Sequence, residues 1–243
     1  MKILFYIHSP SSYQLDFFES LTKEKINFYV IFQNKEINNF SWKFKKNRWS
    51  TFLDSKNQKV NFLTLVKDIN PNIIIIGGYN LKFNYLLKKF PNIKKIFLLE
   101  RVNESNPIKH FLRRKILLSR LKYASAILAV GNEAKKFYLK FNKKVFNLPY
   151  SIIPRLIINK KKNNDKNRVV KFLYVGQLIK RKGLNRLIKV LKSNTFNNAE
   201  FTFVGDGPLK KKIKILATKK NINYFEFLDN SKLNKIYEEN DVL

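Results

Sequence analysis

Residues 172–184 read FLYVGQLIKRKGL, in which four apolar residues lead to a glycine, a short basic segment and a second glycine. An apolar run that ends at a glycine is typical of a strand entering a turn. From Gly183 onward, Leu and Ile recur at the spacing of one helical face, at residues 184, 187, 188 and 191. The stretch therefore predicts a strand–loop–helix unit of a doubly wound sheet, with its loop at the ligand-binding carboxyl edge.

The same alternation of β-rich runs and helical periodicity recurs along the whole chain. Strands are predicted at residues 2–8, 28–32, 73–77, 95–99, 126–130, 145–148, 169–175, 201–204 and 224–227. Helices are predicted at residues 13–23, 62–69, 82–89, 108–123, 133–141, 183–191, 208–217 and 232–237. This order predicts the α/β class, with parallel sheets and crossover helices.

The pattern divides the chain into two doubly wound, Rossmann-like domains. Residues 1–150 form the first and residues 169–243 the second, with a crossover and linker at residues 151–168. The linker contains the polar, basic run NKKKNNDKN, which cannot bury enough apolar surface to pack; a polyanion-binding tract is the alternative. A new strand is expected at residues 241–243, so we expect the second domain to be incomplete and the sequence to be a fragment.

The basic segment Lys180-Arg181-Lys182 offers a phosphate site. Positive side chains and free N–H groups at a helix start bind a diphosphate well, although a solvated basic loop is the alternative. A second strand–turn–helix, FVGDGPL at residues 203–209, has two glycines that allow close backbone approach. The alternative for this segment is a tight turn alone.

Together and in this order, the two segments resemble the C-terminal domain of GT-B glycosyltransferases of family 4, the glycosyl transferases group 1. The resemblance covers residues 121–243 well and the N-terminal domain more loosely. It implies two domains facing a cleft, a nucleotide diphosphate sugar bound by the second, and a glycan or lipid-linked acceptor bound by the first. It also implies retained anomeric configuration, no metal, no cofactor, and a place in cell envelope polysaccharide biosynthesis.

The resemblance also assigns donor-binding residues. Lys182 matches the lysine that holds the donor diphosphate, and Gly205 and Gly207 match glycines that line the nucleotide pocket. Gln177 stands where the family usually has an arginine, and Arg181 or Lys180 is the candidate substitute. The remaining donor-side candidates are Gly176 and Asp206. The family's paired-glutamate motif would lie beyond Leu243, so a non-catalytic nucleotide- or polyanion-binding relative is the alternative function.

Candidates in the first domain follow its strands. His8 ends the first strand, and Ser11 and Ser12 follow it, so these side chains sit at the carboxyl edge. Glu100 and Arg101 follow the predicted strand 95–99 and offer a carboxylate and a guanidinium to an acceptor; a local ion pair is the alternative. His8 and Glu100 are the catalytic candidates, with a structural histidine as the alternative to the first.

The charge suggests a polyanionic partner or a coding bias towards lysine. The net charge is +32, from 49 Lys+Arg against 17 Asp+Glu. The basic residues are spread along the chain, and no stacking aromatics group on a basic face, which argues against nucleic acid. Cysteine is absent, and the apolar runs are too short to span a bilayer. We expect a cytoplasmic protein, with residues 108–122 as a basic, partly apolar helix suited to peripheral contact with anionic membrane.

Overall fold

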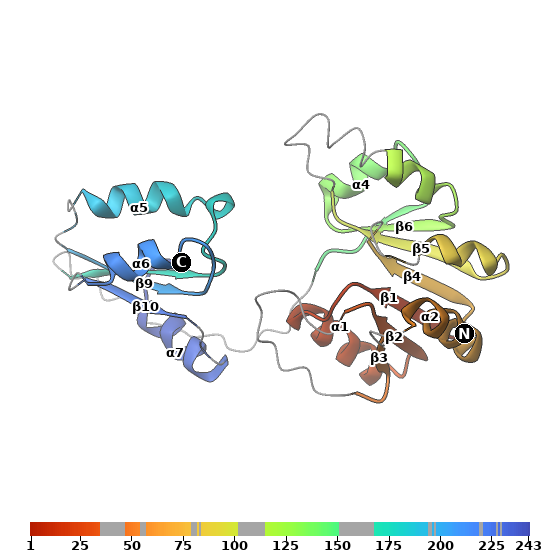
Figure 1. Cartoon of the computed structure of the whole chain (residues 1–243). Coiled ribbons are helices and arrows are strands. Elements are labelled where there is room, and N and C mark those ends of the chain that lie inside the picture. Colours follow the sequence, from red (N-terminus) through yellow and green to blue (C-terminus); the bar gives the residue numbers. More distant parts are fainter. Residues whose placement is uncertain are drawn as a thin grey trace. The chain divides into compact units, whose positions relative to one another are not determined.

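The computed structural model divides into two compact units, Met1–Ile153 and Pro154–Leu243, and each is a parallel α/β unit (Figure 1). The predicted α/β fold class is confirmed. The structure describes residues 1–34, 47–53, 57–78, 82, 84–101, 115–150, 168–193, 196, 198–218, 221–226, 228 and 230–243. The predicted linker tract and residues 108–114 of the predicted membrane-contact helix lie outside these residues.

The first unit alternates strands and helices as its sequence predicts. Its elements are β1 (Ile3–Ile7), α1 (Ser12–Lys23), β2 (Phe28–Phe32), β3 (Ser50–Phe52), α2 (Gln58–Ile69), β4 (Ile73–Gly77), the 3-10 helix η1 (Asn84–Lys89), β5 (Lys94–Leu99), β6 (Ala126–Ala129), α4 (Asn132–Tyr138) and β7 (Val145–Asn147). Residues 115–121 are also helical. Two predictions need correction: β3 was not foreseen, and residues 84–89 form a 3-10 helix within the expected α-helix.

All strands of the first sheet are parallel, in the order β3-β2-β1-β4-β5-β6-β7. The chain runs outward in one direction from β1 through β2 to β3, and in the other direction from β4 to β7. The strand order therefore reverses between β1 and β4. In open parallel sheets a ligand crevice forms outside the carboxyl ends at such a reversal, which places the ends of β1 and β4 at the centre of the candidate site.

Both faces of this sheet are covered by helices. Side chains alternate along a strand, so Tyr6 packs on the α2 residue Phe62, with ring centroids 4.6 Å apart. The neighbouring Phe5 packs on Phe18 of α1, on the other face, with centroids 5.0 Å apart. A strand buried on both faces reads as a continuous apolar run, and this explains why Ile73–Gly77 contains four successive isoleucines.

The second unit repeats the pattern on a smaller sheet. Its elements are β8 (Val170–Val175), the 3-10 helix η2 (Lys180–Lys182), α5 (Leu184–Lys192), β9 (Ala199–Val204), α6 (Lys210–Leu216), β10 (Ile222–Phe225) and α7 (Asn230–Glu239). The strands are parallel in the order β10-β9-β8. Figure 1 shows α5 and α7 on opposite sides of this sheet. Val242 pairs in parallel with Phe172 of β8, as expected for an extended segment at residues 241–243.

The helix α6 provides a matched test of the second core. Ile213 is 0% exposed in the core cluster, whereas Ile215 on the same helix is 69% exposed. We expect Ile213→Val to lower the free energy of unfolding by about 0.5–1.5 kcal/mol, because a buried methyl group is lost. Ile215→Val should change it much less. Urea denaturation of both variants checks this, and equal losses would contradict the assigned packing.

Within the described residues, no helix combines the length and apolar character that a membrane span requires.

Candidate functional site

Two loops meet at the carboxyl edge of the second sheet. Loop A, residues 176–183, follows β8 and includes η2, and loop B, residues 205–209, follows β9. The N–H of Leu178 donates to the carbonyl of Asp206 at 2.9 Å, and the N–H of Leu209 donates to the carbonyl of Leu178 at 3.0 Å. The two segments singled out in the sequence are therefore one hydrogen-bonded structure.

The glycines of loop B are required by this contact. Gly205 has φ +149°, and a Cβ added there would lie 1.9 Å from the carbonyl oxygen of Gly176. A Cβ added at Gly207 would lie 2.8 Å from the carbonyl oxygen of Leu178. The close backbone approach predicted for these glycines is thus made by loop A. This contact explains why glycine is required at both positions without any ligand. The role of the two glycines in nucleotide binding stays a prediction.

Loop A presents its basic residues to solvent. Lys180, Arg181 and Lys182 form η2, and all three are exposed. Among the described residues, no carboxylate pairs with any of them. Gly183, with φ +80°, turns the chain directly into α5. The first N–H groups of a helix lack partners within it and carry partial positive charge, so cations and a helix start coincide here.

The side chains beside these loops hold the loops in place. The Asp206 carboxylate accepts the N–H of Gly207 at 2.8 Å and lies 3.5 Å from the ammonium of Lys210. Lys210 also bonds to Glu226, and that bond, with Asp206 contributing, raises the pKa of Lys210. Gln177 is half-buried, and its carbonyl accepts the hydroxyl of Tyr174 at 2.8 Å. Asp206 and Lys210 therefore stabilise the conformation of loop B, and Tyr174 stabilises that of loop A.

His8 lies at the carboxyl end of β1 and is exposed. The amide nitrogen of Asn34 is 3.2 Å from His8 Nε2, and the Ser9 hydroxyl is 2.9 Å from Nδ1. An amide NH₂ only donates, so this arrangement makes Nε2 the acceptor and leaves Nδ1–H to donate to Ser9. The ring is oriented from both sides, in keeping with either a structural or a catalytic histidine.

The two serine candidates lie at the start of α1. Ser11 is the N-cap residue, but its hydroxyl makes no capping bond. The Ser11 hydroxyl oxygen is buried and lacks a hydrogen-bond partner among the described residues. Ser12 is the first residue of α1, and its side chain lies outside the described set. Among the described residues, the Ser11 hydroxyl therefore makes no hydrogen bond that holds the fold together.

Glu100 and Arg101 have separate partners at the end of β5. The Glu100 carboxylate accepts the hydroxyl of Tyr150 at 2.7 Å, whereas the Arg101 guanidinium lies 3.7 Å from the carboxylate of Glu133. Burial, followed by the bond to Glu100, raises the pKa of Tyr150 well above its ordinary value. Tyr150 therefore stays protonated as a donor at every pH near neutrality, and the alternative of a pair between Glu100 and Arg101 does not match the partners observed.

Three site residues were not foreseen from the sequence. The ring of Tyr13 packs against that of Tyr150 at a tilt of 45°, with centroids 4.4 Å apart, so the two tyrosines connect the serine segment of α1 to Glu100. Gln33, only 4% exposed, accepts the hydroxyl of Tyr6 at 3.0 Å and the N–H of Lys82 at 2.7 Å. These contacts join segments far apart in sequence. The only local signal was the position of Tyr13 beside the two serines.

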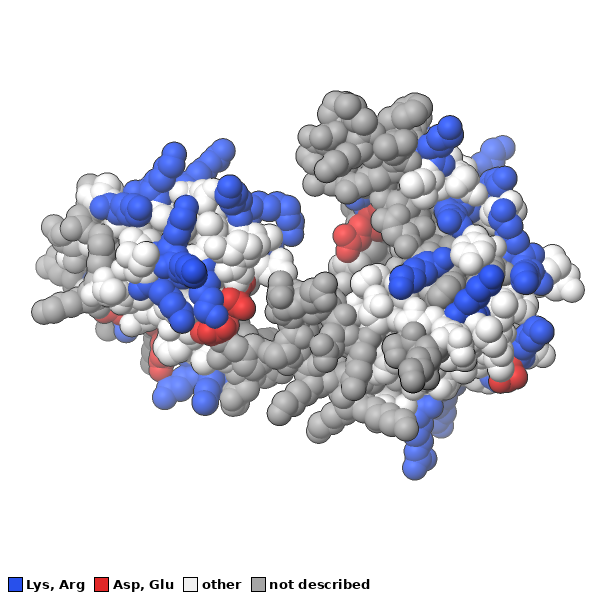
Figure 2. Space-filling view, viewed as in Figure 1, with Lys and Arg blue, Asp and Glu red and all other residues white. Residues whose placement is uncertain are grey.

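Lys and Arg side chains are scattered over the visible surface of each unit, among uncharged residues and with few Asp or Glu (Figure 2). Such a surface raises the local concentration of anions near both candidate edges. Among the described residues, no group of three or more His, Asp or Glu side chains has the arrangement of a metal site.

The second unit, with its paired loops, has a counterpart among known families. Residues 157–243 match the family model of the glycosyl transferases group 1. The match includes both loop A and loop B. A curated relative, the uncharacterized glycosyltransferase MJ1059 of Methanocaldococcus jannaschii, is 25% identical over 247 residues, covering 87% of this chain. The chain spans only 58% of the length of that relative.

Solved structures share the fold at low identity. The apo lipopolysaccharide outer core galactosyltransferase WaaB gives a TM-score of 0.59 at 17% identity, over 98% of this chain and 71% of WaaB. An alpha-glucosyltransferase in complex with UDP and mismatched DNA gives a TM-score of 0.65 at 12% identity, over 100% of this chain and 70% of that enzyme. A UDP-N-acetylglucosamine 2-epimerase gives a TM-score of 0.61 at 13% identity, over 100% of this chain and 72% of the epimerase. These likenesses confirm the twin α/β architecture of GT-B glycosyltransferases, and they include an enzyme of another class.

Proposed function

We propose that this protein transfers a sugar from a nucleotide diphosphate donor to a carbohydrate or lipid-linked acceptor. The observation that carries the proposal is the pairing of loops A and B within the segment that matches the glycosyl transferases group 1. A basic turn, without a carboxylate partner among the described residues, and a helix start meet there on two loops joined by hydrogen bonds. That combination suits a diphosphate group, which needs several positive or N–H donors at once.

The chemistry follows from where charge develops. When the bond between the sugar and the diphosphate breaks, negative charge grows on the leaving phosphate. Lys182 and Arg181, together with the N-terminus of α5, would stabilise that charge. We propose that these groups act without a metal ion and that the anomeric configuration is retained. Gly176, Gln177 and the loop B residues Gly205, Asp206 and Gly207 would form the wall against the nucleotide.

The carboxyl edge of the first sheet would hold the acceptor. Glu100 is hydrogen-bonded by Tyr150, which orients its carboxylate, and the oriented imidazole of His8 ends β1. The Ser11 hydroxyl and Arg101 add a polar contact and a positive charge. A carboxylate and an imidazole both accept a proton from a sugar hydroxyl, so Glu100 and His8 are the proposed groups for activating the acceptor.

The names of the structural relatives fit this reading in different ways. WaaB is named as a lipopolysaccharide galactosyltransferase, and the alpha-glucosyltransferase was solved with UDP. By analogy, we propose a role in building cell envelope polysaccharide, at a cytoplasmic location with peripheral contact to the inner membrane face. The alpha-glucosyltransferase binds DNA in that structure, whereas we propose a glycan or lipid-linked acceptor and no nucleic acid for this chain.

A second candidate is nucleotide or polyanion binding without turnover. Gln177 favours this alternative, because an amide replaces the positive charge that the resembling family places at that position of loop A. An amide would still position a phosphate by hydrogen bonding, but it would not neutralise the leaving group.

A transfer assay decides between the two functions. The full chain is incubated with UDP-, GDP- and ADP-linked hexoses and with glycan and lipid-linked acceptors, with and without EDTA. We expect a glycoside product whose anomeric configuration, read by NMR, is that of the donor, and a rate unaffected by EDTA. Inverted product or EDTA sensitivity would refute the proposed mechanism. Nucleotide binding without product for any pair would favour the binding function.

The acceptor side is tested by Glu100→Gln. This change removes the charge while keeping a group that can accept the bond from Tyr150. We expect nucleotide diphosphate affinity to change less than two-fold, and transfer to fall about 100-fold or more, since one positioned acid–base group is lost. Glu133→Gln, at the partner of Arg101, is the matched control and should alter transfer less. If donor binding falls instead, Glu100 does not belong to the acceptor side.

A further inference from the structure

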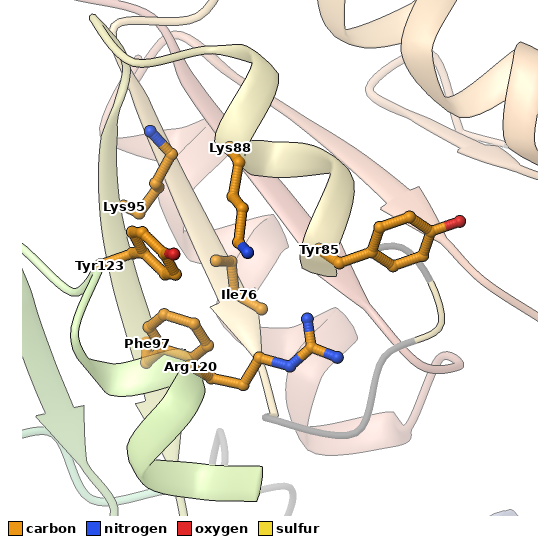
Figure 3. A pocket seen from close by; sticks show the side chains of 7 residues that line it. All are labelled: Ile76, Tyr85, Lys88, Lys95, Phe97, Arg120 and Tyr123. Atoms are coloured by element: carbon orange, nitrogen blue, oxygen red, sulfur yellow. The ribbon is translucent and has the colours of Figure 1, made fainter.

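A basic pocket lies on the first unit, away from the edge where His8 and Glu100 sit. Figure 3 shows it between η1 and the helix at residues 115–121, with Ile76 and Phe97 as its floor. Its polar lining comes from Lys88 and Tyr85 of η1, Arg120 of the helix, and Lys95 and Tyr123. Lys95 is near the amino end of β5. The pocket therefore opens towards the opposite end of the strands from the proposed acceptor edge.

The pocket gathers several positively charged side chains. Lys88 and Lys122 each place an ammonium 5.1 Å from the centre of the Tyr123 ring. Their hydrogen bonds lower the pKa of the Tyr123 hydroxyl. Within the described part of the chain, no carboxylate forms an ion pair with these lysines, with Lys95 or with Arg120. A group of like charges of this kind attracts anions.

Part of this positive charge comes from Lys95, which is buried in the fold. It is 8% exposed, and its ammonium donates to the carbonyl of Phe90 at 2.6 Å and to that of Ile93 at 2.9 Å. Burial lowers the pKa of Lys95. Among the described residues, its bonds reach carbonyls and no carboxylate, so the lysine holds the segment that follows η1 in place and contributes a positive charge to the lining.

Arg120 provides an unused donor at the same place. Its Nε atom is buried and has no hydrogen-bond partner among the described residues. Arginine stays charged at any physiological pH, and a buried N–H without an acceptor is costly. Figure 3 shows the guanidinium extending over the pocket floor on the side facing Lys88 and Tyr85. An acceptor bound in this pocket would satisfy the orphaned donor.

The pocket itself encloses only about 20 Å³, room for about one water molecule, so a phosphate group would lie where the pocket meets a larger hollow. Next to the pocket is an open hollow of about 380 Å³ that shares Lys88, Lys95 and Tyr123 with it, and adds Lys94 and Ser125 to the lining. Arginine and lysine together with hydroxyl groups are the usual partners of phosphate oxygens. The apolar floor formed by Ile76 and Phe97 excludes water from one side, which strengthens such bonds.

We propose that this pocket is a second anion site, which binds a phosphate monoester group through Lys88, Arg120 and Tyr123. The group belongs either to a small soluble phosphate ester or to a phospholipid headgroup presented by a membrane. The site is separate from loops A and B, and the proposal does not depend on sugar transfer.

Calorimetry with glycerol 3-phosphate on the full chain, at about 0.15 M salt to screen exposed charges, tests the soluble form. The pocket variant is Lys88→Met with Arg120→Met. The control is Lys23→Met with Lys67→Met, which removes the same charge from exposed positions on the same unit. We expect the pocket variant to lose at least five-fold in affinity and the control less than two-fold. Tyr123→Phe, which removes one exposed hydroxyl and leaves the core intact, should weaken binding about two-fold.

Sedimentation with vesicles tests the lipid form. Phosphatidylcholine vesicles with and without phosphatidic acid are compared for the same variants. Loss of glycerol 3-phosphate binding in the pocket variant assigns a soluble ester, and loss of phosphatidic acid binding assigns a headgroup; either result supports the site. The proposal is overturned if the pocket and control variants bind both probes equally, or if Tyr123→Phe and the pocket variant both match the unchanged protein.

Discussion

Replacing Gly205 with alanine is expected to cost the second unit more than about 3 kcal/mol, beyond the usual range for overpacking. The added Cβ would lie 1.9 Å from the carbonyl oxygen of Gly176. A rotamer change cannot relieve a contact between backbone atoms and a Cβ, so loops A and B must separate. Separation would break the bonds that join Leu178 to Asp206 and Leu209, each contributing about 1 kcal/mol. Nucleotide diphosphate binding should disappear with them.

Gly183→Ala is the control for this experiment. Gly183 also has a positive φ, of +80°, but a Cβ there has no neighbour within 4 Å. It should cost only about 1–2 kcal/mol, the penalty of the left-handed backbone. Urea denaturation followed by limited proteolysis reports the unfolding of each unit separately. Residues 1–150 should resist cleavage in both variants. Equal losses at Gly205 and Gly183 would show that the contact between the loops is not what requires glycine.

Lys182→Ala is expected to weaken nucleotide diphosphate binding ten-fold or more. A charge-assisted hydrogen bond contributes about 1.5–3 kcal/mol, and Lys182 immediately precedes the glycine that begins α5. The side chain is exposed and has no carboxylate partner among the described residues. Its removal should therefore leave the stability of the second unit nearly unchanged. A loss of affinity in this variant would then reflect binding and not unfolding.

Lys189→Ala controls for the loss of positive charge. Lys189 is exposed and lies in the last turn of α5, far along the helix from its N-terminus. Calorimetry should show less than a two-fold change for this variant, because the partial positive charge and free N–H groups lie at the other end. Unchanged affinity for Lys182→Ala would remove this lysine from the donor site.

The first sheet was largely predictable because its central strands β1, β2 and β4 are buried on both faces. The runs Phe28–Phe32 and Ile73–Gly77 were predicted to the residue, since a continuous β-branched or aromatic run bounded by polar residues is a strong local signal. The three-residue edge strand Ser50–Phe52 has no such signal, because its formation depends on pairing with β2. Short edge strands depend on their neighbour more than on their own composition.

The site was predictable only where its features lie within one segment of the sequence. The glycines of loop B and the basic turn of loop A were identified from single segments, but the contact between the loops was not. The family resemblance implied that the glycines line a nucleotide pocket, which stays a prediction, and the structure adds that Gly205 makes room for Gly176. Tyr150 and Gln33 were missed because their partners, Glu100 and Lys82, are about 50 residues away along the chain.

The central claim is that loops A and B together form the nucleotide diphosphate site. Hydrogen exchange of the full chain, read by mass spectrometry with UDP, GDP and ADP added in turn, tests it most directly. Our account predicts that at least one nucleotide slows exchange in residues 176–187 and 205–210 together, with the same concentration dependence, and that Lys182→Ala abolishes the effect. Protection confined to other segments, or present in one loop without the other, would contradict the claim.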